Sequence, residues 1–416
     1  MGIVRYAVEC PGCKVGLTLR LAVGLDERQS FFIVCPKCSA ATRGALLWRG
    51  GIQTELEISD GRLLDTYRDC QFTININPEY PSVPDAARLN QPGGSAFLMF
   101  VSLLGPDRMA AFQRATHQLR SVIANDWAAL QRLTTYYLKR DWAHFDSTLE
   151  GLIPSEAPRP TQEWHRDDAI HKLYDYLLGP LWVLDEERLY LEMKLAWNSL
   201  WDPSCANLAA MIAFAKAEVE TQLFRDVQRD LFSNIERYVG QVSALLPGLL
   251  CNILPPQHQA KVDEFRLFRD EFELLRDLYI QTFESCHKAL RWVIGVANIE
   301  AHGNPDVFAA PPTAPELAKK IPKNLAAFGK LVSADKRKWL AVLPEWEQRW
   351  DVVFDRHIRN DIGHASAHHE LATGLILREN RPPLPYTRFV ARMQRSIHGL
   401  LATASALKIL RFYAAD

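Results

Sequence analysis

Two Cys-x-x-Cys pairs near the N-terminus have the residue type and the spacing of a metal site. The pairs are Cys10-Pro-Gly-Cys13 and Cys35-Pro-Lys-Cys38. Each pair places two thiolates on one tight turn, so that both sulfurs can reach a single ion at about 2.3 Å. The 21 residues between the pairs (14–34) exceed the usual intervening length of zinc sites by one residue. We therefore predict that these four cysteines bind one structural Zn²⁺ ion tetrahedrally.

The residues around the cysteines predict the short strands that would position them. Apolar side chains alternate through much of residues 1–65, as in Leu17, Leu19 and Leu21, and Gly and Pro separate the runs. With its two cysteine pairs, the region resembles the broad zinc-ribbon family. Because such a small segment has little core of its own, metal binding would supply most of its folding free energy. A redox pair is the alternative interpretation, but one redox motif would not need a second copy.

A second cluster of chemically active side chains lies near the C-terminus. Within nine positions, Arg356 to His364, the chain has two arginines, two histidines, an Asn and an Asp. Histidine titrates near neutral pH and can exchange a proton with a ribose hydroxyl, and an arginine guanidinium can bind two phosphate oxygens at once. Together these residue types are suited to phosphodiester cleavage.

The six residues Arg359-Asn360-x-x-x-His364 resemble the Arg-x4-6-His motif of HEPN domains, which are all-α modules found in many prokaryotic RNases and toxins. The residue directly after the arginine, Asn360, is polar, as is usual in this family. A short turn-rich insert (Thr373 to Pro385) and a final long helix follow the motif, as in many family members. The resemblance covers roughly residues 257–416, and residues 96–256 have no such match.

The HEPN resemblance implies metal-independent RNA cleavage in a homodimer, in which Arg359 and His364 of both chains line one cleft. His364 would act as general base or acid, Arg359 would stabilise charge on the phosphorane, and Asn360 would position Arg359 or the scissile phosphate. Products would carry a 2′,3′-cyclic phosphate, and DNA would be inert because it lacks the attacking hydroxyl. The chain would then be a toxin or anti-phage defence effector, restrained until a regulatory protein or nucleic acid triggers it.

The spacing of Arg359 and His364 constrains the helix that carries them. Five residues on a regular helix are about 140° apart, so the two side chains would not share a face. We therefore expect Arg359 to precede a helix that begins at Asn360 or Asp361, both good N-caps. The alternative is a surface helix start with ordinary ion pairs. On a continuing helix His364 and His368 could bind a metal together, although no third ligand is evident.

Beyond residue 96 the periodicity is helical almost throughout. The clearest apolar stripe begins after Pro255-Pro256 and runs through Val262, Phe265 and Phe268 at steps of three and four residues until Gly303. The cluster His165, Asp167, Asp168 and His171 is predicted to begin a solvated helix. The sequence thus predicts a mainly α chain, divided into a zinc ribbon (1–65), a linker (66–95), a helical middle region (96–256) and an HEPN-like helical bundle (257–416).

The composition limits the compartment and the partners. The formal net charge of −1 indicates neither a nucleic-acid nor a membrane partner, so any surface that binds such a partner must be local. No apolar run is long enough to span a membrane, no signal peptide is evident, and the eight cysteines fit a reducing compartment, so we expect a cytoplasmic protein. Residues 10–49 have six basic against two acidic side chains, so nucleic-acid contact there is an alternative to a plain solvated surface.

A different class of function fits the same motifs. In this alternative the chain is a non-catalytic nucleic-acid- or nucleotide-binding regulatory protein with a structural zinc. The helical bundle would then serve for dimerisation or nucleotide binding. Cleavage of RNA without added metal, lost on substitution of Arg359, would separate the enzyme from the binding protein.

Overall fold

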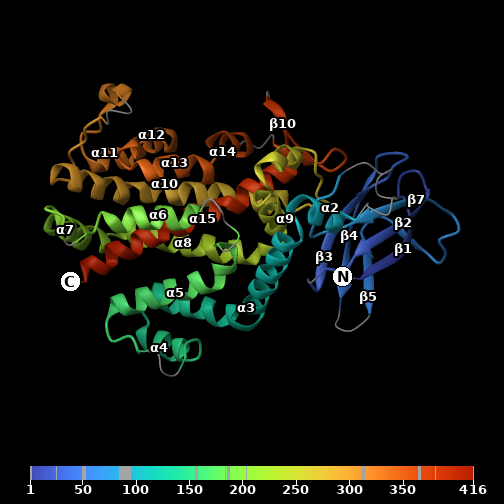
Figure 1. The fold of residues 1–416 in the computed structure, drawn as a ribbon, viewed down its shortest axis with the longest axis horizontal. Coiled ribbons are helices and arrows are strands. Elements are labelled where there is room, and N and C mark those ends of the chain that lie inside the picture. The colour runs from blue at the N-terminus through green and yellow to red at the C-terminus, as the bar shows by residue number, and fades with distance from the viewer. Residues whose placement is uncertain are drawn as a thin grey trace. The chain divides into compact units, whose positions relative to one another are not determined.

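The computed structural model describes residues 2–24, 26–48, 53–83, 95–154, 158–182, 184, 188–202, 204–310, 315–363, 367–379 and 381–415. Most of these residues are helical, and small β-sheets occupy the N-terminal part of the chain (Figure 1). This confirms the prediction of a mainly α chain with a small N-terminal β region. Among the described helices, none is both long enough and apolar enough to cross a membrane.

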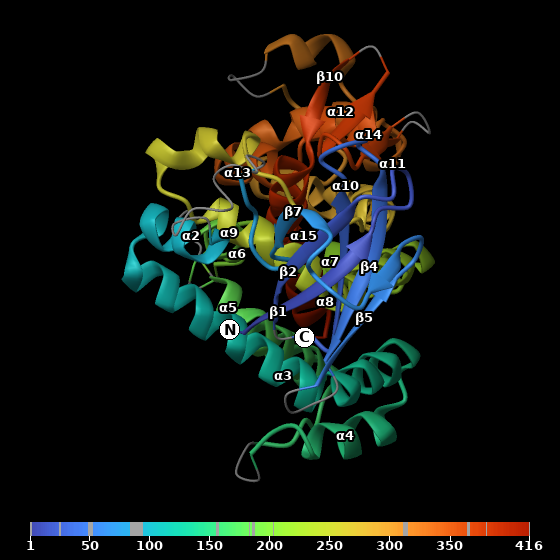
Figure 2. The same ribbon diagram turned by 90° about the vertical axis from the view of Figure 1, so that its right-hand side faces the viewer.

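The N-terminal strands form two sheets. The strands are β1 (Ile3–Glu9), β2 (Gly16–Ala22), β3 (Arg28–Val34), β4 (Ala41–Trp48), β5 (Thr54–Ile58), β6 (Arg62–Leu64) and β7 (Cys70–Ile76). One sheet has the order β6-β1-β2-β7 and the other the order β3-β4-β5. All pairs are antiparallel except β2 with β7, which lie side by side and parallel (Figure 2). Two hairpins, β1-β2 and β3-β4, therefore carry the two cysteine pairs at their turns.

The strands form because their apolar side chains alternate and can bury one face. Leu17, Leu19 and Leu21 of β2 are at most 1% exposed, as the alternation predicted. Strand β3 is an edge strand of its sheet, yet Phe32 is fully buried. The backbone N–H of Phe32 donates to the carbonyl of Phe268 at 2.9 Å, so a distant segment covers this edge.

Strand β7 lies inside the range predicted as a linker (66–95). Its residues Phe72, Ile74 and Ile76 alternate toward the core, and Ile76 is level with Leu21 of β2. The chain then continues to Ser82, which forms a β-bridge with Arg266. The first part of the predicted linker is therefore ordered structure, and residues 84–94 lie outside the described residues.

The described helices occupy most of the chain after residue 95. They are α2 (Ala96–Leu104), α3 (Pro106–Lys139), α4 (Trp142–Glu150), α5 (Glu163–Trp182), α6 (Leu189–Ser199), α7 (Leu208–Val219), α8 (Gln222–Gly240), α9 (Val242–Asn252), η1 (Pro256–Asp263), α10 (Phe272–His302), η2 (Pro315–Lys320), α11 (Leu325–Gly329), α12 (Ser333–Lys338), η3 (Trp339–Val342), α13 (Pro344–Val353), α14 (Arg356–Gly363) and α15 (Tyr386–Ala414). Within this set α13 packs against α6, where the indole N–H of Trp346 donates to the carbonyl of Met193 at 2.9 Å.

The helix predicted to start after Pro255-Pro256 begins later than expected, at Phe272. Residues 256–263 form the 3-10 helix η1, and the next residues are not helical. Phe265 and Phe268 are buried as predicted, but the backbone around them pairs with the β region through Arg266 and Phe268. Tertiary hydrogen bonds therefore override the helical periodicity of this segment.

The turn-rich insert before the last helix is a small antiparallel sheet. Strands β8 (His368–Glu370), β9 (Leu375–Arg378) and β10 (Arg381–Pro385) have the order β10-β9-β8. The long helix α15 then follows directly from Tyr386, as the sequence predicted.

The chain divides into two compact units, and neither is a continuous stretch of sequence. Unit one contains residues 1–112, 241–277 and 357–394, and unit two contains residues 113–240, 278–356 and 395–416. Each unit thus draws on several of the four predicted ranges, whose boundaries stay a prediction. The cysteine-bearing strands and the motif helix α14, apart from its first residue, belong to the same unit.

Candidate functional site

The two Cys-x-x-Cys turns, which we call the knuckles, have the same backbone structure. In the first, the N–H of Cys10 donates to Val15 O at 2.9 Å and the N–H of Lys14 donates to Cys10 O at 3.1 Å. In the second, Cys35 and Ser39 make the equivalent bonds, both at 2.9 Å. The residue after the second cysteine is left-handed in both, with φ of 62° at Lys14 and 59° at Ser39. Two equivalent turns therefore aim four sulfurs at one point.

The four sulfurs lie at the separations that a tetrahedral ion requires. Cys10 Sγ is 3.6 Å from Cys38 Sγ, and Cys13 Sγ is 3.6 Å from Cys35 Sγ. One ligand atom from each of the four cysteines lies within 4.8 Å of the others. A disulfide would need about 2.05 Å, whereas an ion bound at about 2.3 Å to four sulfurs sets them about 3.8 Å apart. The cluster is thus consistent with a metal site such as structural zinc.

Burial makes the thiol of Cys35 a poor free anion. Cys10 and Cys35 are buried, Cys13 is half-buried and Cys38 is exposed. Desolvation raises the pKa of the Cys35 thiol to about 12, because the low-dielectric surroundings disfavour the thiolate. A bound cation supplies the compensating charge.

Glycine at position 12 lets the knuckles approach each other. A Cβ atom built there would lie 3.1 Å from Cys38 Sγ and 3.2 Å from Ala40 Cβ. Lys37 occupies the equivalent position of the second knuckle, so the glycine is required on one side only.

The motif residues Arg359 and Asn360 lie on α14, which begins at Arg356. The expectation that Arg359 precedes a helix starting at Asn360 or Asp361 is therefore wrong. The helix starts after Phe354 and Asp355, where the backbone N–H and carbonyl of Asp355 both bond to the Tyr279 hydroxyl, at 2.8 and 3.2 Å. His364 lies outside the described residues, so the predicted pairing of Arg359 with His364 stays a prediction.

Helix α14 is anchored on one side and exposed on the other. Ile358 and Ile362 are buried, and Asp361 is 7% exposed in an ion pair with Arg378 of β9. Asn360 is exposed, and Arg359 Nη1 donates to its Oδ1 at 3.4 Å. The helix ends at Gly363, where a Cβ would lie 3.8 Å from Arg359 Nη1. Asp361 therefore fixes the helix, and Asn360 beside it is exposed.

The idea that His368 continues the helix is wrong, because His368 is in strand β8. Whether it shares a metal with His364 stays untested, since His364 lies outside the described residues. The side chain of its neighbour His369 is buried, in a contact that the sequence did not predict. His369 Nδ1 lies 3.2 Å from Asp270 Oδ1, and its ring packs on Tyr386 with centroids 4.1 Å apart. Asp270 in turn accepts from Arg43 of β4 at 2.6 and 2.8 Å. A chain of contacts thus links the second knuckle's hairpin to β8.

The cluster around His165 does begin a helix, α5, but it is not simply solvated. Asp167 is 2% exposed and accepts from Arg411 of α15 at 3.0 Å. Asp168 is paired with both Lys172 and Lys408, each at 2.6 Å. These carboxylates hold helices of unit two together.

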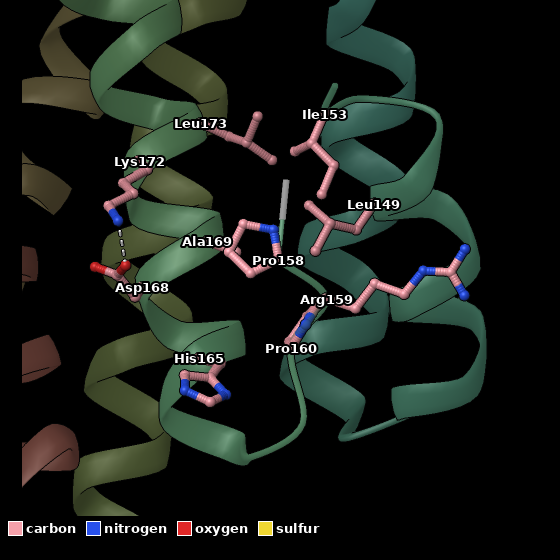
Figure 3. A pocket seen from close by; sticks show the side chains of 10 residues that line it. All are labelled: Leu149, Ile153, Pro158, Arg159, Pro160, His165, Asp168, Ala169, Lys172 and Leu173. Carbon is pink, nitrogen blue, oxygen red and sulfur yellow. Dashed lines mark ion pairs between the residues drawn. The ribbon is translucent and has the colours of Figure 1, made fainter. Parts of the chain in front are cut away.

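A pocket of about 310 Å³ lies between α4 and α5 (Figure 3). Leu149, Ile153, Pro158 and Leu173 face its centre, whereas Lys172 turns to its partner Asp168 and Arg159 points away. The hollow can take an apolar group, but no acid and base converge in it.

Comparisons of the chain with protein-family models, with curated proteins and with solved structures give no match. No family is therefore shown, and the HEPN resemblance rests on Arg359, Asn360 and His364 and on the helical context.

Proposed function

We propose that the chain is a metal-independent endoribonuclease of HEPN type, with Arg359, Asn360 and His364 as its catalytic residues. The observation that supports it best is the arrangement on α14. Arg359 and Asn360 are hydrogen-bonded to each other, Asn360 is exposed, and the helix ends one residue before His364 in the sequence.

The proposed reaction is transfer of the phosphodiester to the neighbouring 2′-oxygen. One His364 takes the proton of the 2′-hydroxyl, the 2′-oxygen attacks phosphorus, and the bond to the 5′-oxygen breaks. The His364 of a second copy gives a proton to that leaving oxygen, and the products are a 2′,3′-cyclic phosphate and a 5′-hydroxyl. The Arg359 guanidinium stabilises the equatorial oxygens of the phosphorane, and Asn360 orients the guanidinium. This chemistry needs a homodimer, in which each copy contributes one pair.

We propose Zn²⁺ as the ion of the four-cysteine cluster. Four thiolates at tetrahedral separations suit zinc or an iron–sulfur centre, and zinc fits a site without redox chemistry. Metal analysis of the purified chain should give about one zinc and no iron per chain. Iron in place of zinc, with a visible absorption spectrum, would overturn this assignment.

The metal supports the proposed nuclease segment through contacts inside unit one. The core around the knuckles includes Phe268, which lies between η1 and α10, and Leu371, the residue after β8. Phe32 contacts the ring of His369 edge-on at 5.9 Å, and the Arg43–Asp270–His369 contacts run beside it. His369 is five residues after His364 in sequence. In this proposal zinc supports the motif by holding β8, the strand that follows it, and has no role in bond cleavage.

The cellular setting is part of the same proposal. The chain would be a cytoplasmic toxin or anti-phage defence effector, kept inactive until a regulatory protein or nucleic acid triggers it. All eight cysteines are free, which suits a reducing compartment.

Cleavage of a fluorescent RNA without Mg²⁺ tests the activity. The protein keeps its bound zinc, which is quantified in the same sample, and free metal is removed from the buffer. Arg359→Ala and His364→Ala should each lower the rate at least about 100-fold, since acid–base groups contribute 10² to 10⁴.

Arg356→Ala is the matched control, because Arg356 is an exposed arginine one turn earlier on the same helix. The Arg356→Ala protein should cleave the RNA at the rate of the original chain. Equal cleavage by the His364→Ala protein would refute the catalytic assignment. RNA binding without cleavage would favour the alternative, a non-catalytic nucleic-acid-binding regulatory protein.

A further inference from the structure

One segment of unit two has a high local density of basic side chains. Residues 319–338 contain six lysines and an arginine against a single acid, Asp335, in a chain whose formal net charge is −1. The segment comprises the end of η2, α11 and α12. A local excess of this kind marks a surface for a polyanion, provided that the charges are exposed and uncompensated.

The segment is held in place by buried apolar residues. Leu317, Leu325 and Phe328 are buried, and Asn324 caps α11 by accepting from the N–H of Ala327 at 2.8 Å. The ring of Phe328 stacks on Phe308 with centroids 5.7 Å apart. The lysines between these anchors are therefore carried on a fixed backbone rather than a free tail.

Four of the lysines are exposed, and one of them, Lys320, lies near enough to Asp335 to help lower the pKa of that carboxyl. Lys319, Lys320, Lys323 and Lys330 are exposed, and within the described part of the chain none forms an ion pair. The other cations are already engaged, since Arg337 pairs with Asp351 and Lys338 with Asp335. We call the four exposed lysines the lysine surface.

Lys336 differs from these four lysines because it is buried, at 7% exposure. Burial is the main cause that lowers the pKa of its ammonium group, and the nearby Glu284 opposes this shift. Lys336 is therefore not counted as part of the exposed charge.

We propose that the lysine surface binds the phosphodiester backbone of RNA. Lysine ammonium groups contact phosphate oxygens as point charges and read no base, so the binding is independent of sequence. The surface lies in unit two and includes none of the proposed catalytic residues. The proposal therefore does not require that the chain cleaves RNA.

An RNA fits this surface better than an anionic membrane does. Membrane-surface helices are long and amphipathic and expose bulky apolar side chains on one face. Here η2 and α11 have six and five residues, and the aromatic rings of the segment are buried. Ile321 and Val332 are exposed, but singly.

The test measures the salt dependence of RNA binding. The full chain with His364→Ala is titrated with a labelled single-stranded RNA of mixed sequence, and fluorescence anisotropy is recorded at several KCl concentrations. Changing Lys319, Lys320, Lys323 and Lys330 together to Gln should weaken binding at least about 10-fold at low salt. It should also reduce the slope of log affinity against log salt by up to about 2.8, since each phosphate contact on a single strand contributes about 0.7.

The matched control changes four exposed cations of α3 and α7 to Gln, namely Arg114, Arg132, Lys139 and Lys216. It should leave the slope nearly unchanged, and circular dichroism should be the same for both variants. An unchanged slope in the lysine variant, or equal losses in both, would overturn the proposal. So would lysine-dependent binding to phosphatidylserine vesicles without RNA binding. RNA binding through these lysines, without cleavage of RNA by the original chain, would support this proposal and contradict the proposed nuclease activity.

Discussion

Cys35 is the residue at which the metal site can be tested most simply. Its thiol is buried with a raised pKa, so that only a bound ion makes its thiolate favourable. We expect Cys35→Ser to reduce the zinc content from about one per chain to near zero and to unfold the knuckles. Metal analysis and circular dichroism measure both effects.

Cys70→Ser is the control, because Cys70 is a free cysteine of β7 outside the cluster. It should keep its zinc. A Cys35→Ser protein with full zinc content would show that the ion is held elsewhere.

Asp361 is predicted to be the anchor of α14. Its carboxylate is 7% exposed beside Arg378, at 12%, and also lies 3.7 Å from Arg381. Removing one partner of a buried pair leaves the other charge unpaired, so Asp361→Ala should lower the free energy of unfolding by about 3 to 5 kcal/mol.

Asp351→Ala provides the comparison, since Asp351 is 58% exposed in its pair with Arg337. Exposed pairs contribute less than about 1 kcal/mol. The urea midpoint of the Asp361→Ala protein should therefore be clearly lower than that of the Asp351→Ala protein. Equal midpoints would mean that Asp361 does not anchor the helix.

At this scale, the sequence predicted the four cysteines by type and spacing, and the sulfurs do cluster. It misplaced Arg359 because the start of α14 depends on Tyr279, 80 residues earlier, which bonds to the backbone of Asp355. His369 was missed because its partner Asp270 is 99 residues away in sequence. Partners so distant leave no signal in local spacing.

Among the elements, the strands β1, β2, β3 and β5 were predictable because the alternation of apolar side chains is a local property. The start of α10 was not. The stripe through Val262, Phe265 and Phe268 satisfies a helix equally well, and only the hydrogen bond from Phe32 and the bridge to Ser82 decide against it.

The contact between β4 and β8 through Asp270 should depend on pH. Burial raises the pKa of the Asp270 carboxyl, but the hydrogen bonds from His369 and Arg43 outweigh it, and the pKa lies below its ordinary 3.8. A lowered pKa stabilises the fold above the unfolded value, and this stabilisation is lost as the pH falls through the folded value.

Asp270→Asn should therefore be less stable than the original chain at pH 6, and the difference should shrink below about pH 4. Urea denaturation of both proteins at pH 6 and at a pH below about 4 measures this difference in the free energy of unfolding. A difference that is the same at both would show that Asp270 does not act through its charge.

The whole molecule could not be inferred from segment boundaries, because each compact unit combines three separate stretches. Pairings such as Ser82 with Arg266 join residues that no local pattern connects. The formal net charge of −1 likewise did not indicate the lysine surface, since a net charge averages over the chain.

Metal removal should act on unit one selectively. After chelation, we expect faster hydrogen exchange in residues 28–48, 265–271 and 367–371, which share the core and contacts of the knuckles. Helix α8, a buried helix of unit two, should keep its protection. Exchange that rises equally in both units would mean that the ion stabilises the whole chain.

The central claim is that Arg359 and His364 cleave RNA through its 2′-hydroxyl, and the chemistry of the product ends tests it most directly. Mass spectrometry of fragments from an RNA of defined sequence should find 2′,3′-cyclic phosphate and 5′-hydroxyl ends, with no such fragments from the His364→Ala protein. Replacing the 2′-hydroxyl by hydrogen at the cleaved positions should stop cleavage there. Fragments with 3′-hydroxyl and 5′-phosphate ends, or cleavage that continues at the deoxy positions, would contradict it.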